Sequence, residues 1–170
     1  MGLKMFFAVA LAMTCCVGPA LADGHSSVKR NKIPGSSFPI AESVEVPAGA
    51  SLVFVSGAVP GPIVENGDPN AIETYGDTEA QTVSVLTRIE ERLDRIGLGL
   101  ADVVMMRAYM VADPKLGRMD FAGFMKGYTQ FFGTAEQPNL PSRSALEVAG
   151  LARPAWLIEI EVVAARPATD

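Results

Sequence analysis

The pattern of hydrophobic and polar positions predicts five strands and two helices after residue 37. Short alternating or β-branched stretches, bounded by Pro, Gly or Asp, are typical of strands. Apolar residues with a helical period fill the segment from Asp77 to Gly97, and an aromatic stripe with the same period follows at residues 118–132. The predicted strands cover residues 43–47, 51–57, 102–112, 143–149 and 156–165. Their chain order is therefore β-β-α-β-α-β-β.

This order favours an α+β fold in which both helices cover one face of a mixed sheet. The other face then lacks cover, and we expect it to carry apolar side chains such as Met106, Met110, Val148 and Ile160. A sheet face that cannot be solvated implies a partner. The pattern alone therefore indicates a homo-oligomer.

Residues 1–22 are typical of a bacterial secretory signal peptide. A short start with Lys4 precedes an apolar run over residues 5–17, and the small residues at 20–22 resemble a cleavage site. We expect cleavage after Ala22 and a periplasmic or secreted protein, with no membrane attachment after cleavage. An uncleaved anchor and a lipoprotein remain alternatives.

Cleavage would leave few residues for covalent or metal chemistry. The sequence contains two cysteines, Cys15 and Cys16, both inside the predicted signal, and one histidine, His25. His25 falls in residues 23–37, a polar segment that we expect to be a flexible lead-in to a single domain at 38–166. These counts exclude a Ser-His-Asp triad, a Cys-His pair and a multi-histidine zinc site in the processed chain.

The charge balance also narrows the possible partners. The chain has 14 Lys and Arg against 19 Asp and Glu, a net charge of −5. No basic patch stands out along the sequence, so we do not expect a nucleic acid partner. After residue 22, no apolar run approaches the roughly 18 residues that indicate a membrane span.

Charged residues interrupt the last two predicted strands. Glu159 and Glu161 are two residues apart, so their carboxylates share one face of the final strand. Arg143 opens the preceding strand. If these two strands pair as a hairpin, Arg143 could hold a planar carboxylate beside a glutamate acting as general base. A solvated sheet face and an ordinary surface ion pair are the alternative interpretations.

Several segments occur in the order and spacing of a known family. They are Ser56-Gly57 after the strand LVFVSG, the helix from Gln81 to Gly97, the strand ADVVMMRAYMVAD, Tyr128 with Phe131-Phe132, Pro141-Ser142-Arg143-Ser144 and Glu159-Ile160-Glu161. Over roughly residues 39–165 the chain resembles the reactive intermediate deaminase family, also called YjgF/YER057c/UK114 or RidA-like.

The resemblance implies a chorismate-mutase-like fold and a homotrimer with its sheets facing inward and an active site in each cleft between subunits. Active members hydrolyse 2-imino acids and their enamine tautomers to 2-oxo acids and ammonia, without cofactor or metal. By the same resemblance, Arg143 would bind the substrate carboxylate and Glu159 would position or activate water. Ser56, Gly57 and Tyr128 would line the substrate site.

The chain departs from the family pattern at several positions. Ala145 stands where cysteine is common, Glu42 falls where a tyrosine is usual and Met125 where an asparagine is usual. These departures leave the choice of substrate open. Trp156, on a longer loop, either packs in the core or narrows the cleft. A module that binds small carboxylates without turnover and a stress-activated holdase are the alternative functions.

Overall fold

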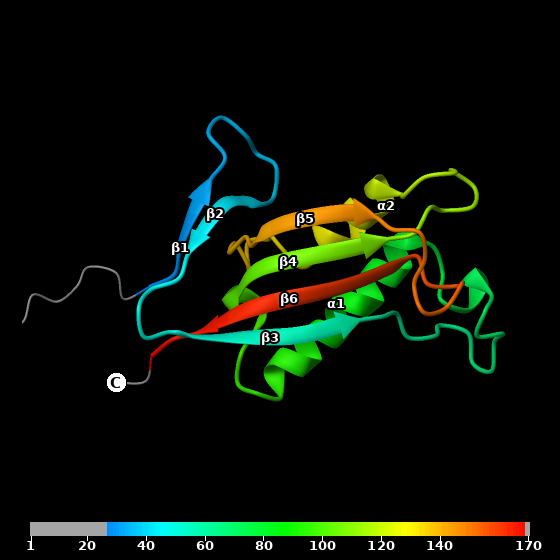
Figure 1. The fold of residues 1–170 in the computed structure, drawn as a ribbon, viewed down its shortest axis with the longest axis horizontal. Helices are drawn as coiled ribbons and strands as arrows, with labels where there is room; N and C mark the ends of the chain where they lie inside the picture. Colours follow the sequence, from blue (N-terminus) through cyan, green and yellow to red (C-terminus); the bar gives the residue numbers. More distant parts are fainter. Residues whose placement is uncertain (1–26, 169–170) are drawn as a thin grey trace, which may run out of the picture.

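The computed structural model of the protein describes residues 27–168, so the predicted signal segment and His25 lie outside the described residues. Figure 1 shows a four-stranded sheet with a separate two-stranded hairpin beside it. The elements are β1 Lys29–Lys32, β2 Ala41–Glu45, β3 Ser51–Ala58, α1 Thr78–Asp94, β4 Val103–Met110, α2 Phe121–Tyr128, β5 Ser142–Glu147 and β6 Ile158–Arg166, with single 3-10 turns at Ile72–Thr74 and Leu100–Asp102.

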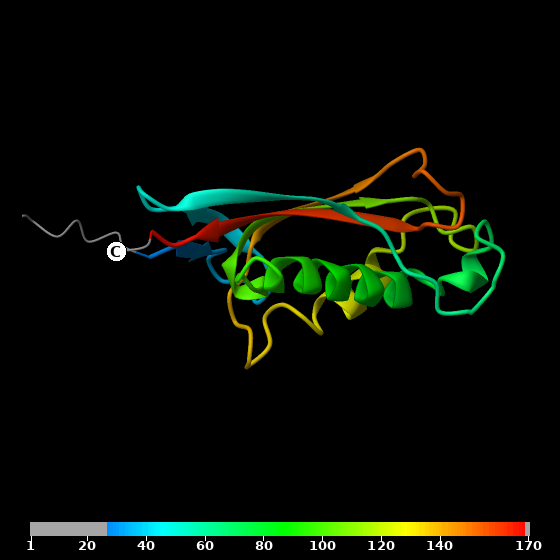
Figure 2. The ribbon, with the colours of Figure 1, turned by 90° about the horizontal axis from the view of Figure 1, so that it is seen from below.

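Both helices lie on one face of the sheet, as Figure 2 shows, which confirms the predicted α+β class. We call this side the helix face and the opposite side the open face. The core forms where α1 and α2 pack on the sheet, because each element turns its apolar side inward. Its buried residues include Leu86, Ile89, Leu93, Met106, Met110, Phe124, Tyr128, Ile158 and Ile160. No helix in residues 27–168 has the length and apolar character needed to cross a bilayer.

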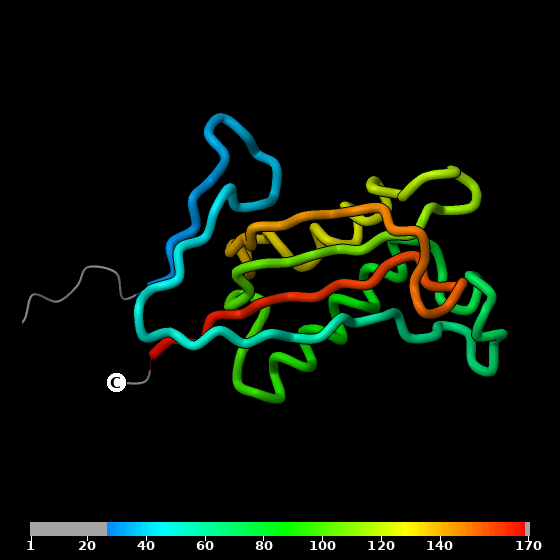
Figure 3. Tube along the Cα trace, in the orientation of Figure 1, coloured from blue at the N-terminus to red at the C-terminus, as the bar shows by residue number. Residues whose placement is uncertain are grey.

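The strand order in the sheet is β3-β6-β4-β5. The last strand, β6, runs antiparallel to both of its neighbours, and β5 runs parallel to β4. The condition under which Arg143 and a glutamate of β6 could converge, a hairpin of β5 with β6, is therefore not met. Residues 148–157 carry the chain past β4 to the centre of the sheet, where β6 buries alternate side chains on the helix face. Both β3 and β5 are left as sheet edges (Figure 3).

The strand register contradicts the prediction that the open face is apolar. Met106, Met110 and Ile160 lie on the helix face and are fully buried. The open face instead carries the alternate residues of these strands, which include Arg107 and Glu161, joined by an ion pair across β4 and β6. The open face is thus partly charged. Neighbouring residues of a strand point to opposite sides of a sheet, so an error of one residue in the assumed register exchanges the two faces.

Residues 29–32 also differ from the expected flexible lead-in. They form β1, which pairs antiparallel with β2. The Arg30 guanidinium donates hydrogen bonds to the carbonyl oxygens of Val103 (2.9 Å), Leu140 (3.0 Å) and Ala101 (2.7 Å). Backbone pairing and this anchor, rather than apolar burial, hold the polar segment in place.

Candidate functional site

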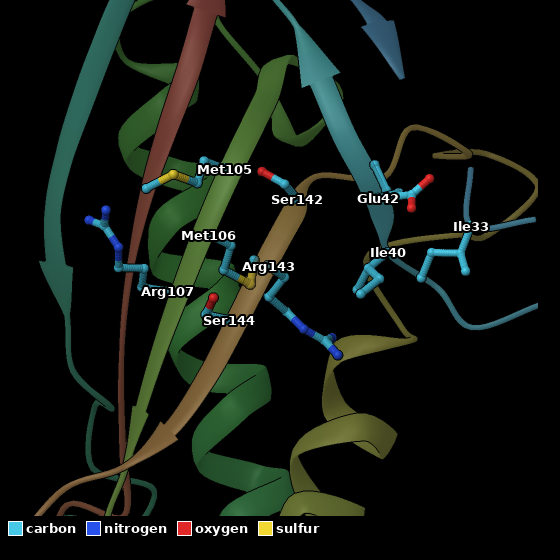
Figure 4. A pocket seen from close by; sticks show the side chains of 10 residues that line it. Ile33, Ile40, Glu42, Met105, Met106, Arg107, Ser142, Arg143 and Ser144 are labelled. Atoms are coloured by element: carbon cyan, nitrogen blue, oxygen red, sulfur yellow. The ribbon is translucent and has the colours of Figure 1, made fainter. Parts of the chain in front are cut away.

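Arg143 is the second residue of β5, and its side chain points to the helix face. It is in register with Met106 of β4, whose side chain is fully buried under the helices. Cross-strand partners share a face, so Arg143 must point toward the same layer. Figure 4 shows its side chain running from β5 toward α2, away from Arg107.

Four aromatic rings surround the Arg143 guanidinium. Its central carbon lies 4.2 Å from the ring centroid of Tyr128, 4.9 Å from that of Phe124, 5.6 Å from that of Phe38 and 6.0 Å from that of Phe121. Three of the rings come from α2 and one from the segment before β2. We call Arg143 and these rings the aromatic cage. A cation over ring faces gains roughly 0.5–2 kcal/mol per favourable pair.

The cage leaves the guanidinium short of hydrogen-bond partners. One terminal nitrogen, Nη2, contacts the sulfur of Met125 at 3.3 Å, which is a weak acceptor. The other, Nη1, is buried without a hydrogen bond. Within residues 27–168, no carboxylate forms an ion pair with Arg143. Burial lowers the pKa of Arg143, and the neighbouring Tyr128 opposes that shift. The result is a partly desolvated cation without a counter-ion in the described chain.

Tyr128 contributes the ring that lies nearest to the Arg143 guanidinium. Its hydroxyl donates a hydrogen bond to the carbonyl oxygen of Pro39 at 2.9 Å, while its ring lies against Arg143. Burial raises the pKa of Tyr128 to about 12, against the opposing effect of Arg143. The phenol is therefore neutral at physiological pH and is already engaged. The structure brings Tyr128 and Arg143 together, as the resemblance implied.

The other predicted site residues gather at a β-bulge in β3. Val55 pairs with Val162 and Ala58 pairs with Ile160, so Ser56 and Gly57 include one extra residue on the β3 side. The Glu159 carboxylate lies against Gly57, and a Cβ on that glycine would overlap it. Arg92 of α1 donates hydrogen bonds to the carbonyl oxygens of Ser56 (2.9 Å) and Gly57 (3.3 Å). We call Ser56, Gly57 and Glu159 the bulge site.

The aromatic cage and the bulge site do not meet within one chain. Arg143 is in register with Met106, whereas Glu159 is in register with Tyr109, three residues further along β4. An odd separation places their side chains on opposite faces of the sheet. The expectation that Arg143 and Glu159 share one cleft formed by adjacent strands is therefore wrong for a single chain.

Glu161 belongs to a separate cluster on the open face. It accepts hydrogen bonds from Arg107 at 2.7 Å and from the Tyr109 hydroxyl at 3.0 Å. The bond from Arg107 is the main reason that the pKa of Glu161 lies below its usual value. The bond to Glu161 also raises the pKa of Tyr109. Glu161 is thus held in a structural network, which separates its role from that of Glu159.

A pocket of about 530 Å³ opens between β5 and the β1–β2 hairpin. Figure 4 shows its lining, with Ile33 and Ile40 on the hairpin side and Ser142 and Ser144 on β5. Arg143 also lines this pocket, so the pocket adjoins the aromatic cage. Glu42, where the family usually has a tyrosine, is exposed at this pocket.

A family model described as endoribonuclease L-PSP matches residues 37–166. The chain belongs to this family, that of the YjgF and RutC proteins. A RutC family protein of Haemophilus influenzae is 31% identical over 139 residues, which are 82% of this chain and 95% of the relative. A RutC family protein of Saccharolobus solfataricus is 34% identical over 134 residues, 78% of this chain and 91% of the relative.

Solved structures of this family share the fold. A Rid family protein of unknown function from Yersinia pestis superposes with a TM-score of 0.62 at 26% identity, covering 81% of this chain and 97% of that one. Escherichia coli TdcF with bound serine superposes with a TM-score of 0.54 at 26% identity, covering 82% and 97%. Membership of the YjgF family and the chorismate-mutase-like fold, both predicted from the sequence, are confirmed.

Two parts of the site in this YjgF/RutC family member were not predicted from the sequence. Phe38, Phe121 and Phe124 complete the cage, whereas the aromatic stripe at 118–132 predicted a helix and no contact of these phenylalanines with Arg143. Arg92, which holds the bulge, carries no signal in the sequence beyond its place on the polar side of α1. Among residues 27–168, no three His, Cys, Asp or Glu side chains form a group that could hold a metal ion.

Proposed function

We propose that this protein hydrolyses 2-imino acids and their enamine tautomers to 2-oxo acids and ammonia. The observation that carries the proposal is the Arg143 guanidinium, seated among four rings with Nη1 buried and unbonded. A substrate carboxylate would supply the missing acceptor and the missing counter-charge in one planar group. TdcF, a relative, has been solved with bound serine, an amino acid whose carboxylate has the same geometry.

We also propose that two chains build each site, within a homotrimer. The argument is the placement of Arg143 at the edge strand β5 and of Ser56 and Gly57 at the opposite edge strand β3. In a closed ring of copies, β5 of one chain can lie beside β3 of the next. Glu159 lies on β6, the strand next to the edge strand β3. Because Gly57 has no side chain, the Glu159 carboxylate can extend over β3 toward the boundary with the next chain.

The chemistry requires no metal or thiol. Water adds to C2 of the protonated imine, and one of its protons passes to Glu159, which leaves a neutral carbinolamine. Glu159 returns that proton to the carbinolamine nitrogen, and the C–N bond breaks as ammonia leaves. The ammonia takes the remaining hydroxyl proton, so the 2-oxo acid and an ammonium ion remain. Because a protonated imine is already electrophilic, fixing the carboxylate and the water can supply most of the acceleration.

The first test measures imine hydrolysis, with the imine generated in situ by an amino-acid oxidase. Arg143→Ala should lower kcat/KM by at least about tenfold, because a hydrogen-bonded ion pair to substrate is lost. Arg143→Lys should recover part of the activity, since the charge stays. Arg118→Ala, at an exposed arginine away from both sites, is the matched control. Unchanged activity in a folded Arg143→Ala protein would contradict the assigned role.

The second test asks whether the site is shared between chains. Arg143→Ala and Glu159→Gln proteins, each inactive alone, are mixed, dissociated and reassembled. A site built from two chains should regain about a quarter of the wild-type activity in a random 1:1 mixture, because one boundary in four then combines both intact residues. A mixture that stays inactive although the copies exchange would contradict the shared site.

Other outcomes would identify the alternative functions. Calorimetric binding of a 2-oxo acid without turnover would indicate a binding module. Protection of an aggregating client that is insensitive to Arg143→Ala would indicate a holdase. The family description names an endoribonuclease, so cleavage of RNA is assayed in parallel. The net charge of −5 gives us no reason to expect it.

We further propose that the protein is exported, from the signal-like residues 1–22. Amino-terminal sequencing of the protein made in a bacterial host should begin at Asp23. Cell fractionation should find it in the periplasm or the medium. Retention of Met1 on the cytoplasmic protein would contradict this proposal.

A further inference from the structure

A charged surface hollow lies along α1. Figure 2 shows α1 on the helix side of the sheet. It has a volume of about 510 Å³ and is lined only by residues of α1 and its C-cap. We call it the arginine groove, and its residues are Ser84, Thr87, Arg88, Glu91, Arg92 and Arg95. The three arginines are four and three residues apart, so they share one side of the helix.

The arginines of this groove lack acidic partners. Within residues 27–168, ion pairs connect Lys29 with Glu45, Arg107 with Glu161 and Lys126 with Glu79, and none involves the groove. The only acidic residue in the lining is Glu91, which leaves a formal charge of +2 from three arginines and one glutamate. Such a positive hollow is unexpected on a chain whose net charge is −5.

Parts of the groove are held in place. Arg92 is tied to the carbonyl oxygens of Ser56 and Gly57. The Ser84 hydroxyl accepts a hydrogen bond from the amide of Gly61 at 2.9 Å, which fixes the loop after β3 against the helix. The guanidinium of Arg88 lies beside Gly61, where a Cβ would come within 3.0 Å of Nη1. The absence of a side chain there keeps Arg88 in contact with the loop.

We propose that the arginine groove binds a small anion carrying at least two phosphate or carboxylate groups. Guanidinium groups form paired hydrogen bonds with both kinds of oxyanion. From Arg88 to Arg95 the helix rises by roughly 10 Å, so a ligand with two charged groups can contact arginines at both ends of the groove. A long polyanion fits less well, because Glu91 interrupts the row and no aromatic ring lines the groove for base stacking.

This site is separate from the proposed imine site. Arg143 lies on β5 and packs against the rings of α2, whereas the groove lies on α1 and does not contain Arg143, Glu159, Ser56 or Gly57. The one link is Arg92, which bonds the backbone carbonyls of Ser56 and Gly57. Binding in the groove therefore does not depend on the proposed deaminase activity.

The test is calorimetric titration of the purified protein with tripolyphosphate and, separately, with citrate. The two probes distinguish a phosphate ligand from a carboxylate ligand. Arg88→Ala combined with Arg95→Ala should raise the Kd of the preferred probe by about tenfold or more, and Arg92 is left intact because it supports the bulge. Added salt should also weaken binding to the wild-type protein.

Two controls make the result decisive. Lys115→Ala combined with Arg118→Ala removes the same charge from an exposed loop and should leave the Kd unchanged. Arg143→Ala should also leave it unchanged. Absence of binding of either probe at millimolar concentration, an equal loss in the loop variant, or tighter binding of single-stranded RNA than of tripolyphosphate would overturn the proposal.

Discussion

At the scale of single residues, the unusual feature is a cation that is stabilised by rings instead of by a carboxylate. Arg143 contacts four aromatic rings and one thioether, yet one of its nitrogens stays buried and unbonded. A permanent acidic partner would neutralise the guanidinium, whereas ring faces attract it and leave its edges unpaired. The same side chain is thus held in position and remains able to bind an anion.

Gly57 is the residue on which the bulge site depends most directly. A Cβ at this position would overlap the Glu159 carboxylate, so Gly57→Ala should displace it. We expect kcat for imine hydrolysis to fall about 10- to 100-fold, because small misplacements of a reacting group are costly. The control is Gly150→Ala, since a Cβ at Gly150 has open space around it. Equal activity of the two variants would argue against a role for Glu159.

The Glu161 network predicts a dependence of stability on pH. The pKa of Glu161 is lowered in the folded protein, so its contribution is present above its usual value of 4.5 and is lost as the pH falls through the folded pKa. Glu161→Gln should therefore have a lower Tm than the wild-type protein at pH 7, and the gap should close in acid. The gap will be modest because the pair is largely exposed to solvent.

Thermal melts from pH 7 to pH 3 check this prediction. Glu90→Gln, at an exposed position of α1, is the control and should show no such convergence. A Glu161→Gln gap that widens in acid would contradict the sign.

At the scale of elements, the sequence predicted what periodicity and helix-end signals can show. The amphipathic stripe ending at Gly97 predicted α1 closely, and Asp77 caps its start by accepting a hydrogen bond from the amide of Ala80. The helix predicted at 118–132 covers only Phe121–Tyr128, because the chain turns after Thr129 toward Gly133, which has a positive φ of 76°. The aromatic stripe continues through these turns, so the pattern did not mark the end.

Pairing between distant strands could not be predicted in the same way. The alternation in β5 and β6 is compatible with either order of strands, and the true order depends on the course of residues 148–157. For β1 the difficulty is different. Its residues are polar, and its anchor is Arg30 bonded to backbone carbonyls far away in sequence, the nearest of them at Ala101. Such contacts leave no pattern in the local sequence.

Arg30 therefore provides a test of how β1 is held. Arg30→Ala should speed amide hydrogen exchange in β1 and β2, because three hydrogen bonds to the body of the protein are lost. Exchange in β6 should stay slow. The matched variant is Lys29→Ala, which removes only a surface ion pair to Glu45 and should change little. Fast exchange in β1 of both variants would show that the anchor is not specific.

At the scale of the whole molecule, the sheet shows where further copies can attach. Both of its edges are unpaired, and the open face carries Phe54, whose exposed fraction is 76%, with Leu52 and Leu146 about half exposed. Exposed apolar side chains beside an unpaired edge favour association. The proposed trimer would cover them.

Phe54→Asp should therefore shift the protein from trimer to smaller species, measured by light scattering coupled to size exclusion. It should also abolish imine hydrolysis while leaving the aromatic cage intact, because Phe54 does not contact Arg143. Leu116→Asp changes a half-exposed apolar residue in the loop after β4 and should keep both mass and activity. A Phe54→Asp protein that remains a trimer would place the interface elsewhere.

The position of β6 also determines when this chain can fold. The strand that separates β3 from β4 is the last of the described strands to be synthesised, and its residues 158–166 are the sole partner of β3 in the described sheet. A growing chain therefore cannot assemble this sheet until residues 158–166 have been made. For the proposed export, such a delay would keep the polypeptide unfolded and able to pass through a membrane channel until β6 has been added.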